Sequence, residues 1–282
     1  MPELPEVETI VRKLQQLLPG KHIVQVEKFH PKSFQGEHSM IEGAEIQQVS
    51  RRAKVINIHL NQNRHLLVHL KMTGQLIYLD DTVRVGGGHP TADWVQALPS
   101  KHTRVALSFA DHSKLFFNDQ RLFGWLKTVK SADLPLFFEG MGPDVIDPLV
   151  TPEYLAQIFK SRSVPVKQLI MDNTIMCGLG NIYACDALNV AQIHPLRPGK
   201  SLSFEEIERL LAASRKVLLK GIELGGTTFD GKYVDVDGMA GKYQSIVRVY
   251  GREGKPCLHC GTPIEKIQLG GRGTYFCPSC QV

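Results

Sequence analysis

The chain has 282 residues, a length that predicts about two domains, and 43% of its residues are hydrophobic and 22% charged. That composition is typical of a globular protein and excludes wholesale disorder. The sequence predicts no membrane span, because it has no stretch of about 18 apolar residues. The 33 basic and 28 acidic residues leave a net charge of +5, which is compatible with a polyanionic partner without indicating one. The acidic N-terminus does not resemble a signal peptide, so we expect a cytoplasmic protein.

The N-terminal half predicts one helix followed by β-strands. Over residues 5–18, apolar side chains recur with the i, i+3, i+4 spacing of one buried helix face. Short runs rich in Val, Ile, Leu and Phe follow at residues 22–29, 53–60, 65–70, 75–79, 104–109 and 114–118. Strands without intervening helices predict a β-sandwich or barrel. Residues 80–101 include three consecutive glycines, and we expect a mobile loop there.

The composition changes near residue 140. Glycine and proline recur over residues 140–148, as in an interdomain linker. Thr151 and Pro152 form a helix start, and Ser203 to Glu206 form a capping box followed by apolar residues at helical spacing. Residues 151 to about 223 are therefore expected to be helical. The remaining tail is rich first in glycine and then in cysteine.

Four of the six cysteines lie in residues 257–282, at Cys257, Cys260, Cys277 and Cys280. Two Cys-x2-Cys pairs can place four thiolates tetrahedrally around one zinc ion, which would be structural because no coordination position stays open. The alternative is a set of free or disulfide-bonded thiols, which a chain without a secretion signal disfavours. Between the pairs, the glycine-rich stretch predicts a hairpin turn. Arg272 in that turn would either contact a phosphate or be only a solvated turn residue.

The N-terminus suggests covalent chemistry. Removal of the initiator methionine would give Pro2 a free secondary amine. When such an amine attacks an aldehyde-level carbon, it forms an iminium that stays an electron sink and acidifies the neighbouring C–H. The adjacent Glu3 could move protons to and from the reacting group. The alternative is an ordinary cytosolic start, because acidic residues often begin helices.

Other patterns have structural explanations of equal or greater weight. Asn181 lies in a segment with two nearby glycines. This pattern indicates either a phosphate-binding site or only a turn at which two helices pack. Met72 and Phe123 are core residues by default, although an apolar wedge beside Arg121 could fill the gap left by an extruded base. Lys54 opens a predicted strand, where a basic cluster is usually a solvated edge.

Taken together, these motifs resemble the bacterial formamidopyrimidine-DNA glycosylase family, also called 8-oxoguanine DNA glycosylase. The resemblance runs over nearly the whole chain. Its most specific segments are residues 2–9 (Pro-Glu-Leu-Pro-Glu-Val-Glu-Thr), residues 180–183 (Gly-Asn-Ile-Tyr), and the Tyr-Gly-Arg at 250–252 that precedes the four cysteines.

The resemblance implies a bifunctional glycosylase and abasic-site lyase that removes oxidised purines and cleaves the strand by β,δ-elimination. Pro2 would be the nucleophile at C1′ and Glu3 the general acid/base. Lys54 and Arg272 would contact phosphate and assist β- and δ-elimination. The remaining DNA-binding residues match Met72, His102, Arg121, Phe123, Arg162 and Asn181. No cofactor beyond one structural zinc is implied.

The implied fold is an α+β multidomain protein that acts on damaged double-stranded DNA as a monomer in the bacterial cytosol. Residues 1–142 would form an N-terminal helix and β-sandwich, residues 143–228 a helix–two-turn–helix domain, and residues 229–282 a lesion loop and zinc finger. Leu122 and Ser163 depart from the family pattern by removing positive charge near DNA, which would lower or redistribute its affinity.

Two alternatives remain at this point. One is the related endonuclease-VIII-like group, which prefers oxidised pyrimidines. Its members more typically begin Pro-Glu-Gly-Pro-Glu, where this chain has leucine at position 4. The other is a non-catalytic zinc-finger DNA-binding protein that has kept the fold. Borohydride trapping of the protein on an oligonucleotide that contains 8-oxoguanine would distinguish all three.

Overall fold

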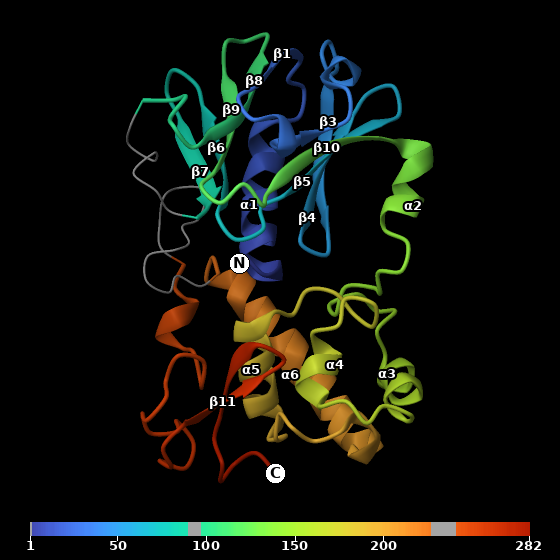
Figure 1. Ribbon diagram of the computed structural model, residues 1–282, viewed down its shortest axis with the longest axis vertical. Coiled ribbons are helices and arrows are strands. Elements are labelled where there is room, and N and C mark those ends of the chain that lie inside the picture. The colour runs from blue at the N-terminus through green and yellow to red at the C-terminus, as the bar shows by residue number, and fades with distance from the viewer. Residues whose placement is uncertain (1, 90–96, 227–240) are drawn as a thin grey trace. The chain divides into compact units, whose positions relative to one another are not determined.

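The structure is a computed structural model that describes residues 2–89, 97–226 and 241–282 (Figure 1). The chain divides into two compact units, Met1–Glu139 with Leu224–Gln244 and Gly140–Glu223 with Ser245–Val282. The sequence predicted three parts with separate functions, and that division stays a prediction. Most of the predicted lesion loop lies at residues 227–240, outside the described residues. None of the described helices has the length and apolar character needed to cross a membrane.

The first unit is an N-terminal helix with a β-sandwich, as the sequence predicted. Helix α1 spans Leu4–Leu17, and the short α2 spans Leu134–Phe137. The two five-stranded sheets have the strand orders β1-β8-β9-β6-β7 and β2-β10-β5-β4-β3. Their strands are β1 (Ile23–Lys28), β2 (Phe34–Gln35), β3 (Ile46–Arg52), β4 (Val55–Leu60), β5 (Arg64–His69), β6 (Gly74–Leu79), β7 (Arg84–Gly88), β8 (Thr103–Phe109), β9 (Lys114–Asp119) and β10 (Trp125–Lys130).

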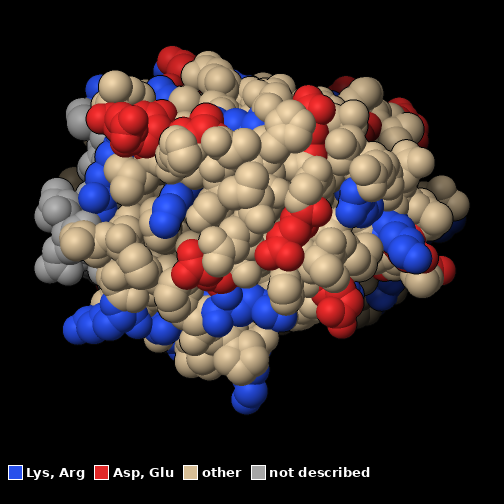
Figure 2. Space-filling view, turned by 90° about the horizontal axis from the view of Figure 1, so that it is seen from above, with Lys and Arg blue, Asp and Glu red and all other residues tan. Residues whose placement is uncertain are grey.

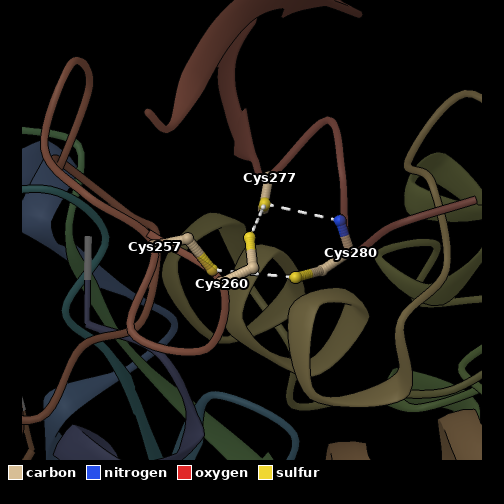
Figure 3. A group of neighbouring side chains, drawn as sticks. All are labelled: Cys257, Cys260, Cys277 and Cys280. Atoms are coloured by element: carbon tan, nitrogen blue, oxygen red, sulfur yellow. Dashed lines mark hydrogen bonds between the residues drawn. The ribbon is translucent and has the colours of Figure 1, made fainter. Parts of the chain in front are cut away.

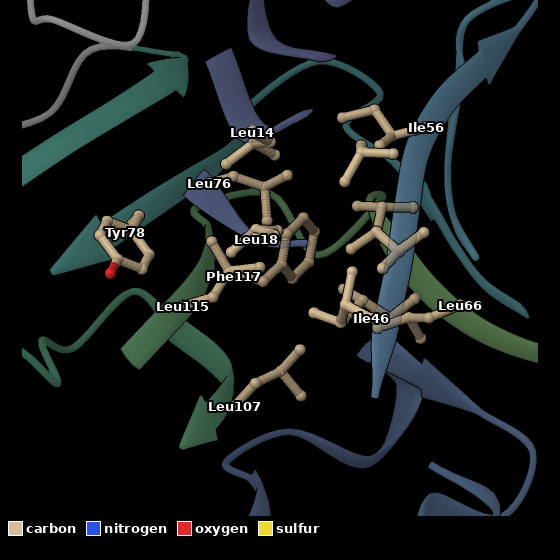
Figure 4. Close-up of a cluster of buried hydrophobic side chains, with 14 of the residues drawn as sticks. Leu14, Leu18, Ile46, Ile56, Leu66, Leu76, Tyr78, Leu107, Leu115 and Phe117 are labelled. Atoms are coloured by element: carbon tan, nitrogen blue, oxygen red, sulfur yellow. The ribbon is translucent and has the colours of Figure 1, made fainter. Parts of the chain in front are cut away.

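One apolar core joins α1 to both sheets. The helix contributes its buried stripe, which includes Ile10 and Leu14, and the strands contribute inward side chains such as Ile56 and Phe117 (Figure 4). The i, i+3, i+4 spacing places the apolar residues of α1 on one face, and burial of that face stabilises the helix more than propensity does. The core therefore holds the N-terminus of α1 at a defined place on the sandwich.

The sequence predicted a mobile loop at residues 80–101. That prediction is wrong for the first part of the segment, because Arg84–Gly88 is strand β7, which pairs antiparallel with β6. A glycine-rich strand has little β propensity, so this stretch carries no strand signal. Gly88 is needed for close approach, because a Cβ there would lie 2.3 Å from the carbonyl oxygen of Gly74. Strands β3 and β10 were also missed.

The second unit contains the helices and the cysteine-rich tail. Its helices are α3 (Pro152–Phe159), α4 (Val166–Ile170), α5 (Asn181–Ala191) and α6 (Phe204–Glu223). The predicted capping box is confirmed, because the backbone N–H of Glu206 donates to the Ser203 hydroxyl at 3.2 Å and the N–H of Ser203 donates to the Glu206 carboxylate at 2.9 Å. The tail forms a hairpin of β11 (Glu265–Leu269) and β12 (Arg272–Phe276).

Candidate functional site

Pro2 and Glu3 lie at the start of helix α1. The side chain of Glu3 is buried, with 4% of its surface exposed. Its backbone N–H donates to Oε2 of Glu6 at 2.7 Å, and its carbonyl accepts from the N–H of Val7 at 3.1 Å. Gly226 passes so close to Glu6 that a Cβ there would lie 2.8 Å from Oε1. The peptide that follows the Pro2 nitrogen is therefore held in one orientation.

Lys54 lies in the two-residue turn between β3 and β4, which corrects its expected place on a solvated strand edge. Only 8% of its surface is exposed. Ala53 takes φ +55°, a left-handed conformation that closes the turn. Arg51 donates to the Ala53 carbonyl at 2.9 Å and to Glu8 on α1 at 3.0 Å. Burial raises the pKa of Glu8, but Arg12 and Arg51 outweigh this and keep the pKa below its ordinary value.

The candidate void-filling side chains, Met72 and Phe123, are exposed and do not belong to the core. Their exposed fractions are 42% and 53%. The guanidinium of Arg121 lies 4.8 Å from the centre of the Phe123 ring, a cation–π contact that keeps the two side chains together. Leu122 between them takes φ +59°. Large apolar side chains that stay in solvent are available to a ligand, whereas core side chains are not.

One buried carboxylate organises the segments that carry these residues. Asp119 is 1% exposed and lies at the end of β9, opposite Gly74 at the start of β6. Its carboxylate accepts from the Thr73 hydroxyl, from the backbone N–H of Arg121 at 3.2 Å and from that of Gly124 at 2.7 Å. The turn after Met72 and the loop through Phe123 are therefore tied to the same group.

His102 lies beside the same carboxylate-centred loop. Its carbonyl accepts from the backbone N–H of Asp119 at 2.9 Å, and its own N–H donates to the Ser100 hydroxyl at 3.0 Å. Arg104 donates through Nε to the carbonyl of Asp119 at 2.7 Å and through Nη1 to that of Lys101 at 3.1 Å. The backbone that carries His102 is thus held by the side chain of Arg104.

His69, at the end of β5, is a half-buried titratable group near Lys54. Burial lowers the pKa of its imidazole to about 4, and the charges of Lys71 and Lys54 act in the same direction. The ring nitrogen Nδ1 accepts from the backbone N–H of Lys71 at 3.0 Å, which requires that nitrogen to be unprotonated. The ring also packs against Trp125, with 5.7 Å between the ring centres. His69 is therefore neutral at physiological pH.

In the second unit, Asn181 begins helix α5, and both the oxygen and the nitrogen of its amide are hydrogen-bonded. The oxygen accepts from Nζ of Lys167 at 2.5 Å, and the nitrogen donates to the carbonyl of Gly273 at 2.9 Å. Lys167 is 2% exposed and also donates to the Thr274 hydroxyl at 2.6 Å. Sequence reasoning missed Lys167, because a lone lysine carries no signal that it will be buried.

Arg272 and Arg162 both lie on the surface of this unit, although in different elements. Arg272 begins β12, directly after the turn at Gly270 and Gly271. These two glycines take φ values of +56° and +72°, as a two-residue hairpin turn requires, so the predicted turn is confirmed. Arg162 follows α3, and its carbonyl accepts from the N–H of Lys200 at 2.9 Å. Both guanidinium groups are exposed.

The four predicted metal ligands come together. Their sulfur atoms all lie within 4.8 Å of one another (Figure 3). The sulfur–sulfur distance is 3.9 Å between Cys257 and Cys280 and 3.5 Å between Cys260 and Cys277. Tetrahedral zinc with Zn–S bonds of about 2.3 Å requires sulfur atoms about 3.8 Å apart. The donor set and its geometry therefore fit one zinc ion with no open coordination position.

Replacement of Cys260 by serine is expected to remove the zinc and unfold the finger. Metal binding to a closed four-thiolate site contributes folding free energy, on the order of 10 kcal/mol. Metal analysis of purified protein measures the loss, and Cys177→Ser, a buried cysteine outside the cluster, is the control. A Cys260→Ser protein that keeps one equivalent of zinc would contradict the assignment.

His69 is expected to make the protein less stable in acid. Its pKa in the folded state, about 4, lies below the ordinary value of 6.5, so the unfolded chain binds the proton first as the pH falls. Stability is therefore fully present above about pH 6.5 and declines towards pH 4. Urea unfolding at pH 7.5 and 5.0 should show a smaller decline in His69→Gln, which keeps an acceptor but does not titrate. Equal declines in the two proteins would show that His69 does not contribute.

Comparison with known families agrees with this geometry. Residues 1–126 match the formamidopyrimidine-DNA glycosylase N-terminal domain, residues 141–232 its H2TH domain, and residues 254–282 the zinc finger found in FPG and IleRS. The formamidopyrimidine-DNA glycosylase of Pelotomaculum thermopropionicum is 40% identical over 288 aligned positions, which cover 100% of this chain and 99% of that protein.

Solved structures give the same result. The Lactococcus lactis Fpg in complex with abasic-site DNA superposes with a TM-score of 0.86 at 30% identity over 100% of both chains. MutM (Fpg) from Thermus thermophilus superposes with a TM-score of 0.85 at 38% identity, over 99% of this chain and 98% of that one. The four-cysteine cluster is accordingly the site of one structural zinc. This chain belongs to the formamidopyrimidine-DNA glycosylase family and is a base-excision DNA glycosylase.

Proposed function

We propose that the chain excises oxidised purines from double-stranded DNA and cleaves the strand, with the secondary amine of Pro2 as nucleophile. The buried Glu3 carboxylate next to that amine is the observation that carries this proposal. The amine attacks C1′ of the damaged nucleotide, an N–C1′ bond forms, and the base departs with the electrons of the glycosidic bond. Glu3 supplies and removes protons in these steps.

The covalent intermediate then leads to strand cleavage. Ring opening gives an iminium that withdraws electrons from C2′, so loss of a C2′ proton expels the 3′ phosphate by β-elimination, and a second elimination expels the 5′ phosphate. Lys54 is assigned to the first elimination and Arg272 to the second. The burial of Lys54 in a tight turn supports a fixed position for its ammonium group.

DNA contact is proposed through individual side chains. Basic and acidic side chains are interspersed on the face drawn in Figure 2. The proposed phosphate contacts are His102, Arg162, Arg272 and Asn181. The hydrogen bonds of Asn181 to Lys167 and Gly273 fix the orientation of its amide. Each phosphate neutralised by a cation releases counterions and makes binding salt-dependent.

The substrate class is supported by the relatives. Solved Lactococcus lactis Fpg structures hold abasic-site DNA and Fapy-dG-containing DNA, and one holds DNA with an oxidised pyrimidine. Excision assays with purine and pyrimidine lesions side by side therefore measure the lesion range. We further propose that the protein acts as a monomer in the bacterial cytosol.

A retained or tagged Met1 is expected to abolish both activities, because it converts the Pro2 amine into an amide that is not nucleophilic. Borohydride trapping on duplex DNA containing 8-oxoguanine measures the covalent intermediate directly. Binding to DNA with a stable abasic analogue is the control, and it should persist. A fully active protein with an N-terminal fusion would exclude Pro2 as the nucleophile.

Phe123→Ala is expected to slow excision from duplex DNA with little change in melting temperature, because this exposed ring would fill the space left by the flipped base. Cleavage at a preformed abasic site should suffer less, since no base remains to be extruded. Phe117→Ala is the matched control: this ring is 1% exposed, and its loss should destabilise the fold by about 3–5 kcal/mol. Equal loss of both activities in Phe123→Ala, with a large fall in melting temperature, would assign Phe123 to packing.

A further inference from the structure

We propose that Gln281 is a positioning residue that fixes the orientation of the zinc finger on helix α5 and thereby places Arg272. The inference deepens the role proposed above for Arg272, and its activity measurement rests on that role. It concerns the part of the chain that follows the last cysteine, which the zinc site itself does not require.

Gln281 is the penultimate residue, yet it is 1% exposed. Chain ends usually fray unless they are tied down. Here Oε1 accepts from the backbone N–H of Cys277 at 2.8 Å and from Nδ2 of Asn189 at 3.1 Å. Nε2 donates to the carbonyl of Ile193 at 2.9 Å, and the backbone N–H donates to the Cys277 carbonyl at 3.1 Å. One side chain thus joins the metal-binding turn to helix α5 and to the segment after it.

Asn189 extends this link to the other end of the finger. It is 4% exposed on α5, and its Oδ1 accepts from Nε of Arg248, on the segment that leads into the finger. Its Nδ2 binds Gln281, on the segment that leaves the finger. The same helix side chain therefore holds both segments that flank the four cysteines.

A second anchor lies at the N-terminal end of the same helix. Asn181 binds the carbonyl of Gly273 at the hairpin end, while Asn189 reaches the turn at Cys277 through Gln281. The two asparagines are eight positions apart, which corresponds to about 12 Å of helix, and Gly273 and Cys277 are four positions apart, which corresponds to about 13 Å of strand. Two matched anchors fix the direction of β12, whereas one anchor would leave the hairpin free to pivot.

The geometry requires an amide at position 281. The group must accept from two N–H donors and donate to one carbonyl. A glutamate lacks the donor, and a methionine of similar size lacks both functions and leaves three buried polar atoms unpaired. Since the four ligands remain, such variants separate finger orientation from metal binding.

The test uses full-length, zinc-loaded Gln281→Met, with Ser279→Ala as matched control. Ser279 lies in the same metal-binding turn, but it is exposed, and its hydroxyl accepts from that of Thr262. Gln281→Met should keep one zinc, and amide hydrogen exchange over residues 265–276 should rise by about tenfold, because hydrogen bonds that restrain local opening are lost. The control should match the native protein in zinc content and exchange.

Activity supplies the second readout. In Gln281→Met, δ-elimination should fall by about tenfold while borohydride trapping and β-elimination persist, and in an Arg272→Ala background the substitution should have no further effect. Loss of zinc, or unchanged exchange with zinc retained, would overturn the proposal. If exchange rises but Arg272→Ala itself leaves δ-elimination unchanged, the placement by Gln281 is supported and the role proposed for Arg272 is wrong.

Discussion

The second unit depends on buried polar side chains of helix α5. Asp186 is fully buried and accepts from the backbone N–H groups of Arg248 and Val249 at 3.0 and 3.1 Å, at the start of the tail. Asn181 and Asn189 bind the hairpin and the metal-binding turn. A helix that buries the Asp186 carboxylate and the Asn189 amide must pair both, because each unpaired group costs more than a paired one contributes. The finger, the segment that leads into it and, for Asn181, Lys167 supply the partners.

This dependence explains how such a small finger acquires a defined surface. Zinc closes the four-cysteine loop, but the tail has few apolar residues of its own, and its core is shared with Cys185 of α5. Burial raises the pKa of the Cys185 thiol to about 11, so it stays protonated and packs as a small apolar group. Metal and helix together hold the strand that begins with Arg272.

In the first unit, too, a buried polar side chain holds separate segments together. Asp119 ties the turn after Met72 to the loop that carries Arg121 and Phe123, so three exposed side chains depend on one buried carboxylate. Their exposure has a physical consequence, because apolar side chains in water can be buried by DNA without unfolding the core. The carboxylate itself is a group that no motif of the sequence marked.

Local features of the protein followed directly from the order of its residues. The spacing of Cys257, Cys260, Cys277 and Cys280 specified the zinc site, the apolar stripe specified α1, and the glycine pair specified the hairpin turn, because each depends on neighbouring residues only. Long-range packing set the rest. It paired the glycine-rich β7 with β6, buried Lys54 in a turn and left Phe123 exposed, since burial is set by partners distant in the chain. It also brought Gln281 to Asn189, 92 positions earlier, where two amides meet for which the sequence holds no local signal.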